Sequence, residues 1–297
     1  MAAVSRRETF ERKHLSEERN GFPFEMCAFD LDGTLMRFDM TISDDTMNAL
    51  ESLRANGIRV VLATGRRYEG AREHAMRLGF GEDEPLVCYG GSMIRSIGGD
   101  TLLENSMPVE GALEVLEWTE RRGLHARIFV DEKIVTSPDT PAALATMASF
   151  IEDKVETVES PRAWLAERRE DPIKVTIVDS PDDVEEWLGD AEKEFSERYF
   201  VTRSLPHYVE IGAADGKKSA ALGFLCEKWG ISPARILAFG DGENDIDMLR
   251  FAGRGVAVGG MTEAVREAAD EMTESVNEEG VARYIEGMLD GVSGAAS

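Results

Sequence analysis

Five oxygen-bearing side chains follow two apolar stretches of the sequence and have the chemistry to bind a cation. Asp30 and Asp32 stand two residues apart directly after one apolar run. Asp241, Asn244 and Asp245 follow another apolar run by one short loop. Residues i and i+2 of a strand point to the same side, so the carboxylates of Asp30 and Asp32 should face one crevice. Repulsion between them raises the pKa of one carboxyl group or requires a cation nearby. Asp and Asn oxygens suit Mg²⁺, which makes a magnesium site the prediction.

A calcium-binding loop is the obvious alternative for both segments. The EF-hand pattern requires Gly at its sixth position, and counting from Asp241 that position holds Ile246. Counting from Asp30, Thr34 stands where the fifth-position Asp or Asn belongs. Neither segment is therefore an EF-hand, although for the first segment alone a turn that merely ends a strand remains an alternative.

A second group of residues is suited to an anion. Thr64 and Gly65 lie where another apolar run meets a helix, and a hydroxyl with free backbone N–H groups there can hold an anion. The alternative for Thr64 is a simple N-cap. Lys217 and Lys218 open a helix, where they oppose the helix dipole, in a chain with only eight Lys. This position suggests that they neutralise a phosphate, and the alternative is a solvated surface pair.

Apolar runs alternate with helical patterns in the first and last parts of the chain. Nearly uniform apolar strands that alternate with helices predict a parallel sheet with right-handed crossovers, whose carboxyl edge is the usual ligand site. The expected strands span residues 24–29, 58–63, 86–89, 236–239 and 255–258, and the expected helices span 44–56, 217–229, 262–269 and 280–289, with two more that end at Leu78 and Leu249.

The middle of the chain has a different pattern. The alternating segments 125–130 and 174–178 predict half-exposed antiparallel strands, and helices are expected around 110–122, 140–153 and 182–197. This combination predicts an α+β insertion, with one open-faced sheet covered by helices.

These patterns together predict an α/β fold with a Rossmann-like parallel-sheet core and an inserted α+β domain. The core is expected over residues 23–92 and 206–290, and the insertion over 93–205. A charged N-terminal arm is expected over 1–22 and a tail over 291–297.

Composition narrows the function classes. The chain has 297 residues, 42% of them hydrophobic, which is enough for a sizeable core. It has 57 acidic and 33 basic residues, and the net charge of −24 argues against a nucleic-acid binder or a protein that docks on anionic membranes. No apolar run is long enough for a membrane span, and the N-terminus lacks a signal-peptide core. The three cysteines are far apart and are expected to be reduced core residues, so we expect a soluble, cytoplasmic protein.

Four segments, in order, resemble the motifs of the haloacid dehalogenase-like superfamily. They are residues 29–35 (FDLDGTL), 63–66 (ATGR), Lys218 with the residues after it, and 240–249 (GDGENDIDML). The ending over residues 269–282 is similar to the Cof-type branch of that superfamily, whose insertion is a type II-B cap. The resemblance covers nearly everything from Phe24 to Leu289 and implies that the inserted domain is a cap.

The resemblance implies a Mg²⁺-dependent phosphatase that hydrolyses a small phosphomonoester, such as a sugar phosphate. Asp30 would be the nucleophile, forming an aspartyl-phosphate, and a carboxylate nucleophile splits hydrolysis into two easier displacements. Asp32 would protonate the leaving oxygen and then take a proton from the attacking water.

The resemblance also implies a metal shell and a phosphate seat. Mg²⁺ would be held by Asp30, the backbone carbonyl of Asp32 and Asp241, with Asn244 and Asp245 in or beside its shell. The phosphoryl oxygens would be held by Thr64, Gly65 and Lys218, and Arg66 would reach the substrate or the cap. The expected partner is a small phosphorylated metabolite, with no nucleic acid and no membrane, and the oligomeric state is left open.

The sequence departs from the family pattern at two places. Many relatives carry Asn-Gly-Ala at the end of the third strand, where this chain has residues 89–92 (YGGS), so an Asn that would orient the substrate is missing. The usual Lys-Gly of the third motif is Lys218-Ser219 here, with Lys217 as a second candidate. Hinges for cap movement are expected near Gly91 and Pro206.

Two other functions remain open from the sequence. A phosphotransferase such as a phosphohexomutase can use the same core. A non-catalytic phospholigand-binding module is the third possibility, and it would be expected to lack one of Asp30, Asp32 and Asp241, all of which are present.

Overall fold

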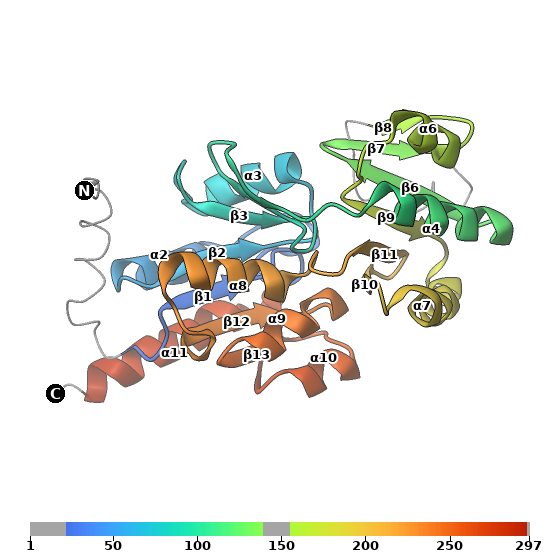
Figure 1. Cartoon of the computed structure of the whole chain (residues 1–297). Helices are drawn as coiled ribbons and strands as arrows, with labels where there is room; N and C mark the ends of the chain where they lie inside the picture. Colours follow the sequence, from blue (N-terminus) through green and yellow to red (C-terminus); the bar gives the residue numbers. More distant parts are fainter. Residues whose placement is uncertain (1–21, 139–154, 296–297) are drawn as a thin grey trace, which may run out of the picture.

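Two β-sheets, each with its own helices, make up the part of the chain that the structure describes. The computed structural model describes residues 22–138 and 155–295. The two sheets lie at opposite ends of the molecule in Figure 1, and the chain passes between them at residues 105–108 and 214–217. We call the unit with the larger sheet the core and the other unit the cap.

The core sheet has eight strands in the order β14-β13-β12-β1-β2-β3-β4-β5. The first six in this order run parallel, and the last two are added antiparallel at one edge. Their bounds are β1 Met26–Phe29, β2 Arg59–Ala63, β3 Pro85–Cys88, β4 Met93–Ser96, β5 Thr101–Glu104, β12 Ile236–Gly240, β13 Arg254–Val258 and β14 Glu271–Thr273. The predicted parallel sheet is therefore confirmed.

Helices cover both faces of the core sheet, as expected for strands whose residues are buried on both sides. One face is covered by α2 (Asp44–Ala55), α3 (Tyr68–Arg77) and α11 (Gly280–Ala295). The other is covered by α8 (Lys218–Trp229), α9 (Ile246–Phe251) and α10 (Glu263–Ala268). Short 3-10 helices span Pro233–Arg235 (η1), Glu243–Asp245 (η2) and Val276–Glu278 (η3).

The cap sheet has six strands in the order β10-β11-β9-β6-β7-β8, antiparallel except for the β7–β8 pair. Its helices α4, α6 and α7 pack on one face. The strands are β6 His125–Val130, β7 Lys133–Thr136, β8 Val155–Thr157, β9 Lys174–Val178, β10 Tyr199–Leu205 and β11 Tyr208–Ala213, and the helices are α4 Val109–Arg122, α6 Pro161–Arg168 and α7 Pro181–Phe195. The predicted helix over 140–153 lies outside the described residues.

The other face of the cap sheet lies against the core, which corrects one expectation. The strands β6 and β9 were expected to be half-exposed, but every residue in both is buried. Phe129 and Ile134 of this face share one hydrophobic cluster with Tyr89 and Met93 of the core. The alternation of polar and apolar residues in these strands therefore reflects the two faces of the cap sheet. Both faces are buried, one under the cap helices and the other against the core.

The domain boundaries also differ from the expected ones. Strands β4 and β5 were expected in the insertion, but β4 pairs with β3, and β5 with β4, in the core sheet. Strand β11 was assigned to the core, but it pairs with β9 and β10 in the cap sheet. By strand pairing, the insertion therefore lies between β5 and α8 and ends with β11 at Ala213. The expected boundaries differ because backbone hydrogen bonds decide which sheet a hairpin joins, and the hydrophobic pattern does not report them.

Smaller corrections concern the two ends. Phe22 was placed in the charged arm, but it is buried and makes an edge-to-face contact with Phe24. The expected tail begins inside α11, which continues to Ala295. The three cysteines are buried and free, as expected. No helix among the described residues is long and apolar enough to cross a membrane.

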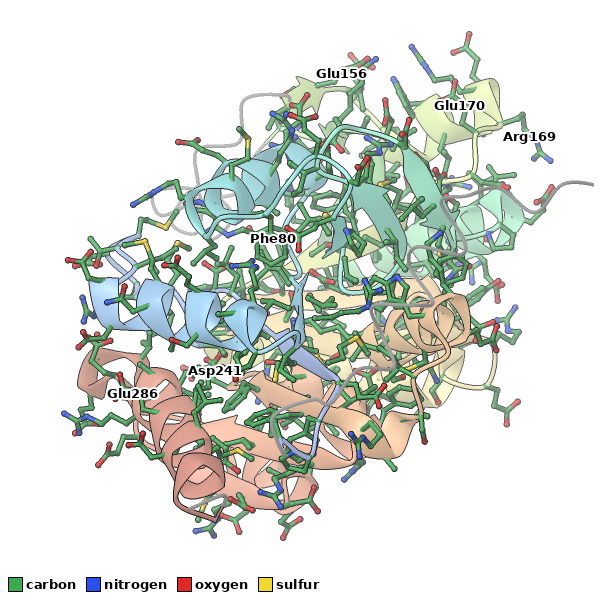
Figure 2. All side chains as sticks on the ribbon, turned by 90° about the vertical axis from the view of Figure 1, so that its left-hand side faces the viewer. Phe80, Glu156, Arg169, Glu170, Asp241 and Glu286 are labelled. Carbon is green, nitrogen blue, oxygen red and sulfur yellow. The ribbon has the colours of Figure 1, made fainter. Side chains whose placement is uncertain are left out.

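The acidic surplus lies largely on the surface, with an important exception. Figure 2 shows Glu170 and Glu286 pointing outward, whereas Asp241 lies among the ribbons of the core. Buried carboxylates are rare unless they are paired or bind a metal, so Asp241 and its buried neighbours point to the site.

Candidate active site

Three neighbouring core strands end at one edge of the sheet and deliver polar residues there. Asp30 follows β1, Thr64 follows β2 and Asp241 follows β12. Because β1 pairs in parallel with both β2 and β12, these three strand ends lie side by side. Short apolar strands with both faces buried thus bring three distant sequence segments to one place, as the parallel-sheet prediction required.

The ammonium group of Lys218 lies between two buried carboxylates. Its Nζ is 2.5 Å from Asp30 Oδ1 and 2.6 Å from Asp245 Oδ1, and its side chain is fully buried. Burial alone would lower the pKa of Lys218, but the two carboxylates raise it above its ordinary value. Lys218 is therefore a permanent cation at this point of the site.

The carboxyl group of Asp30 is held in an unusual electrostatic environment. Burial raises its pKa well above the ordinary value, Lys218 lowers it, and the charges of Asp245 and Asp241 raise it further. Because these influences oppose one another, the protonation of Asp30 responds strongly to an added cation or anion. Such a group is typical of functional sites.

A set of oxygen atoms suited to a hard cation lies beside Lys218. Asp30, Asp241 and Asp245 each offer a carboxylate oxygen, and these oxygens all lie within 4.8 Å of one another. Asp241 Oδ1 accepts a hydrogen bond of 2.8 Å from Thr34 Oγ1, and burial together with Asp245 raises the pKa of Asp241 to about 7. The negative charges of the three carboxylates exceed the one positive charge of Lys218, so a bound cation would relieve their repulsion. Mg²⁺ prefers oxygen ligands of this kind, and these residues therefore fit that ion.

Asp245 also braces the loop that carries Asp241. Its Oδ2 accepts the backbone N–H groups of Asp241 at 3.1 Å and Gly242 at 2.9 Å, while its Oδ1 receives Lys218. Both oxygens are thus engaged by protein groups. Among the acidic residues expected at the metal, Asp30 and Asp241 have oxygens less occupied by such bonds, and Asp245 positions Asp241.

Gly33 permits the close approach of the first and fourth motifs. Its φ is +87°, and a Cβ added there would lie 2.4 Å from Asp241 Oδ2. Any larger residue would push the Asp241 carboxylate away from Asp30.

Asp32 is held by Arg66, the residue that follows the Thr64–Gly65 turn. Arg66 Nε donates to Asp32 Oδ2 at 2.7 Å, and its Nη2 donates to Asp32 Oδ1 at 2.6 Å. This bidentate contact fixes the carboxylate plane. Asp32 is not part of the cluster of Asp30, Asp241 and Asp245. The expectation that Arg66 also reaches the substrate or the cap stays a prediction.

The Thr64–Gly65 turn lies next to the fourth motif. Thr64 Oγ1 accepts the Arg66 backbone N–H at 3.1 Å, and helix α3 begins only at Tyr68, so Thr64 does not cap that helix. A Cβ placed on Gly65 would lie 3.5 Å from Asn244 Nδ2. The backbone of the second motif and the Asn244 amide therefore border the same space.

The structure distinguishes the two adjacent lysines. Lys218 is the one that reaches the carboxylates, whereas the backbone of Lys217 lies against Gly91. A Cβ on Gly91, whose φ is +107°, would be 2.1 Å from the Lys217 carbonyl carbon. The start of α8 is held by Asp247, whose Oδ2 accepts the Ser219 N–H at 2.6 Å.

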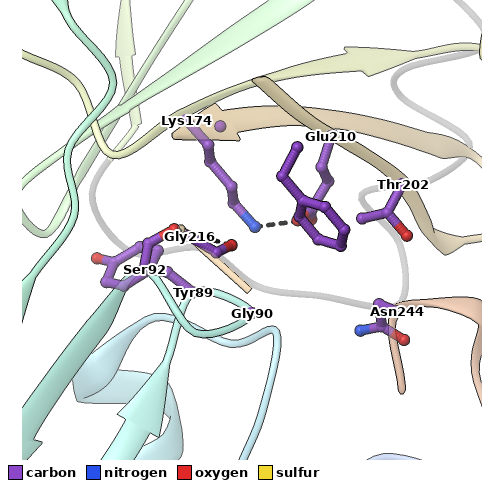
Figure 3. Close-up of a pocket in the computed structure, with 10 residues that line it drawn as sticks. Tyr89, Gly90, Ser92, Lys174, Thr202, Glu210, Gly216 and Asn244 are labelled. Atoms are coloured by element: carbon purple, nitrogen blue, oxygen red, sulfur yellow. Dashed lines mark hydrogen bonds and ion pairs between the residues drawn. The ribbon is translucent and has the colours of Figure 1, made fainter. Parts of the chain in front are cut away.

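The cap contributes a second wall to the site. A pocket between the two units is lined by core residues Tyr89, Gly90, Ser92, Gly216 and Asn244 and by cap residues Lys174, Phe200, Thr202, Glu210 and Gly212. Figure 3 shows the Lys174–Glu210 ion pair, 2.7 Å long, on the cap side of this pocket, with Asn244 on the core side.

Several polar contacts hold the cap against the core. Arg203 of β10 forms two hydrogen bonds with Glu243 of η2, within the loop of the fourth motif. At another point Tyr89, with φ +53°, donates its hydroxyl to the Asp131 carbonyl of the cap at 2.7 Å. The residues that stand in place of the family's Asn-Gly-Ala therefore include a contact between the units.

Sequence reasoning missed five residues near the site. Thr34 lies inside the first motif, and only this position in the sequence indicates that it contacts the site residue Asp241. The other four could not be assigned, because their partners are distant in sequence, although Lys174 stands out as a lysine within an apolar strand. They are Lys174, Arg203, Glu210 and Glu243.

Comparison with known proteins agrees with this geometry. A family model of haloacid dehalogenase-like hydrolases matches residues 27–285. The chain is 26% identical over 272 residues to the 5-amino-6-(5-phospho-D-ribitylamino)uracil phosphatase YitU of Bacillus subtilis, covering 88% of this chain and 96% of that protein. It is 28% identical over 274 residues to the pyridoxal phosphate phosphatase YbhA of Escherichia coli, covering 88% and 97%.

A solved structure shows the same two-unit fold. A sugar phosphatase of haloacid dehalogenase subclass IIB superposes with a TM-score of 0.75 at 23% identity, over 90% of this chain and 99% of that one. The family model spans both parts of the core and the cap between them, and all four motifs lie inside it. With the strand ends, the buried lysine and the carboxylate cluster in place, the chain belongs to the haloacid dehalogenase-like hydrolase family.

Proposed function

We propose that this protein is a Mg²⁺-dependent phosphatase that hydrolyses a small phosphomonoester through an aspartyl-phosphate on Asp30. The observation that carries this proposal is the buried Lys218, shared between Asp30 and Asp245 beside the Asp241 carboxylate. The relatives named above act on small phosphorylated metabolites, which supports the same class of substrate here.

The first step is attack by Asp30 on phosphorus. The P–O bond to the leaving alcohol breaks as the Asp30 oxygen forms its own bond to phosphorus, and Asp32 gives the leaving oxygen its proton. In the second step water attacks the same phosphorus, Asp32 takes the proton of that water, and the Asp30 carboxylate is released with inorganic phosphate. Arg66 orients Asp32 through both carboxylate oxygens, and it must release one of them when Asp32 carries the proton.

The transferring phosphoryl group is held by donors from three motifs. Lys218 supplies a positive charge that does not titrate near neutral pH. The Thr64 hydroxyl hydrogen and the backbone N–H of Gly65 supply neutral donors, and the Asn244 amide borders the same space. Such fixed donors stabilise charge as it develops on phosphoryl oxygens.

Mg²⁺ is proposed to be held by Asp30, the Asp32 carbonyl and Asp241, with Asp245 beside them. When bound, the ion reduces repulsion between the anionic nucleophile and the anionic ester. Thr34 and Asp245 orient the Asp241 carboxylate for this role.

The cap is proposed to close over the ester and to open for release. The crossing segments at 105–108 and 214–217 carry this movement, near but not at the hinges expected at Gly91 and Pro206. The cytoplasm as the place of action remains a prediction from the sequence.

The proposal is tested by phosphate release from a panel of phosphomonoesters, with Mg²⁺ and with EDTA. Wild-type protein should release phosphate only with the metal, and Asp30→Asn should release none. Transfer of the phosphoryl group to a second sugar instead of water would favour the phosphohexomutase alternative. Binding of esters without turnover would favour the non-catalytic module.

A further inference from the structure

The Lys174–Glu210 ion pair lies in the pocket where the leaving group of a phosphomonoester must sit. The pocket begins at Asn244, which borders the Thr64–Gly65 turn, and extends to the cap sheet. A phosphoryl group seated between Lys218 and that turn therefore directs its alcohol part toward the cap. Figure 3 shows Lys174 and Glu210 of the cap across the pocket from Asn244. This location follows from the proposed function, and the inference below rests on it.

The pair presents a donor and an acceptor side by side. Lys174 Nζ is 2.7 Å from Glu210 Oε1, and Ser204 Oγ donates to the same oxygen at 2.7 Å. Within the described part of the chain, no hydrogen bond is recorded to Glu210 Oε2. The ammonium group lies 5.0 Å from the centre of the Phe129 ring and keeps N–H groups beyond the one directed at Glu210.

Stability does not explain this pair. The Lys174 side chain is 5% exposed and that of Glu210 is 12% exposed, so both charges are largely removed from water. Replacing a buried ion pair with apolar residues is often neutral or stabilising, because the attraction barely offsets desolvation. A buried pair that borders a pocket is thus better explained by what the pocket binds.

The charges around the pocket balance. Glu210 neutralises Lys174, and Arg203 is paired with Glu243 at the rim. Arg127 lies farther along the same face, where it donates to the Tyr208 hydroxyl, and it does not line the pocket. The remaining lining is neutral, with the Thr202 hydroxyl and the Phe200 ring among it.

We propose that Lys174 and Glu210 bind the hydroxyl groups of a neutral, polyhydroxylated leaving group and exclude esters that carry a second phosphate. A hydroxyl can donate to Glu210 Oε2 while its neighbour accepts from Lys174. The Phe200 ring offers an apolar surface to the C–H face of such a molecule. A second phosphate, as a dianion, has no proton to donate to Glu210, and the Glu210 charge opposes its attraction to Lys174.

The test compares three esters: a hexose 6-phosphate, a hexose 1,6-bisphosphate and p-nitrophenyl phosphate, which has no hydroxyl groups. Wild-type kcat/KM should favour the monophosphate over the bisphosphate by about tenfold or more, because a site built for hydrogen bonds rejects ligands that cannot complete them. In Glu210→Gln, which keeps the shape but removes the charge, this ratio should fall by about tenfold.

The leaving group of the p-nitrophenyl ester enters the same pocket but offers it no hydroxyl groups, so this ester reports the part of the rate that does not depend on hydroxyl binding. In Glu210→Gln its kcat/KM should fall by a smaller factor than that of the hexose monophosphate, since the aryl ester loses no hydroxyl contact. Glu117→Gln is the matched control: its carboxylate pairs with Arg121 on α4, and it should change no ratio. Lys174→Gln is the second variant, and it should lower kcat/KM for the hexose monophosphate by a larger factor than for the aryl ester.

Two results would overturn the inference while the proposed function stands. One is equal use of monophosphate and bisphosphate by the wild-type protein. The other is a Glu210→Gln effect that lowers the rate for all three esters by the same factor. If none of the esters, including p-nitrophenyl phosphate, is hydrolysed with Mg²⁺, the proposed function itself fails and this inference fails with it.

Discussion

Replacing Lys218 with Met should destabilise the protein strongly, because it leaves two buried carboxylates without their cation. The ammonium is 2.5 Å from Asp30 and 2.6 Å from Asp245, and all three groups are buried. Breaking a buried ion pair by removing one partner costs about 3 to 5 kcal/mol. We expect the free energy of unfolding to fall by about that amount in EDTA at pH 8.

The sequence neighbour supplies a matched control. Lys217 is half-buried at the start of α8, and its backbone, which the substitution keeps, makes the contact with Gly91. Lys217→Met should therefore change the free energy of unfolding by about 0.5 kcal/mol or less. Chemical denaturation followed by circular dichroism measures both variants under the same conditions.

Two further results would identify the cause of the loss. Asp30 has a raised pKa in the folded state, and removal of Lys218 raises it further, so the variant should regain stability at lower pH as the carboxyl group binds a proton. The double variant Lys218→Met/Asp245→Asn should recover about 1 to 3 kcal/mol, because one uncompensated charge is gone. Equal losses in Lys218→Met and Lys217→Met would refute the reasoning.

Three other predictions follow from single contacts. Gly91→Ala should lower the free energy of unfolding by at least about 2 kcal/mol more than Gly90→Ala. The reason is that a Cβ on Gly91 would lie 2.1 Å from the Lys217 backbone, whereas nothing lies within 4 Å of a Cβ on Gly90. Similar denaturation midpoints for the two variants would contradict this. Without metal, the wild-type thermal midpoint should fall as pH rises from about 4 to 7, because the folded protein keeps the Asp241 proton up to a pKa of about 7 while the unfolded chain loses it near 3.8. That decrease should be smaller in Asp241→Asn. Mg²⁺ should raise the thermal midpoint of the wild-type protein more at pH 8 than at pH 5, since metal binding competes with the proton. An equal rise at both pH values would count against Asp241 as a ligand. Arg203→Met, which removes the contact between the cap and Glu243, should lower kcat/KM by about fivefold to thirtyfold and enlarge the radius of gyration in solution scattering, as expected for loss of about 1 to 2 kcal/mol of contact energy. Glu185→Gln removes the exposed partner of Arg203 within the cap and should leave both quantities unchanged.

The sequence was sufficient to predict the core and the convergence of its motifs. Runs such as Met26–Phe29 and Ile236–Gly240 are short and apolar throughout, which favours strands buried on both faces. Parallel strands place their carboxyl ends at one edge, so the proximity of Asp30 and Asp241 follows once the sheet is parallel.

Pairings that depend on register could not be predicted in this way. The hairpin of β4 and β5 has no local feature that assigns it to one sheet or the other, and the same holds for β11. The pairing of Lys174 with Glu210 depends on the register between β9 and β11, where Lys174 lies opposite Gly212 and Glu210 opposite Thr176. A single sequence carries no signal for such a diagonal contact.

The role of Arg66 was similarly beyond the sequence. Its position after Thr64 and Gly65 indicates a place at the site, but three partners of opposite charge lie there in Asp30, Asp32 and Asp241. Only the turn after β2, in which the Arg66 N–H bonds to Thr64, directs the guanidinium to Asp32.

Identification of the residue that carries the phosphoryl group tests the central proposal most directly. The protein is mixed with Mg²⁺ and excess p-nitrophenyl phosphate, quenched in acid within milliseconds, digested and analysed by mass spectrometry. We predict a phosphorylated peptide with the phosphoryl group on Asp30, present in wild-type protein and absent from Asp30→Asn. A phosphoryl group on another residue, or turnover that persists in Asp30→Asn, would contradict the proposed mechanism.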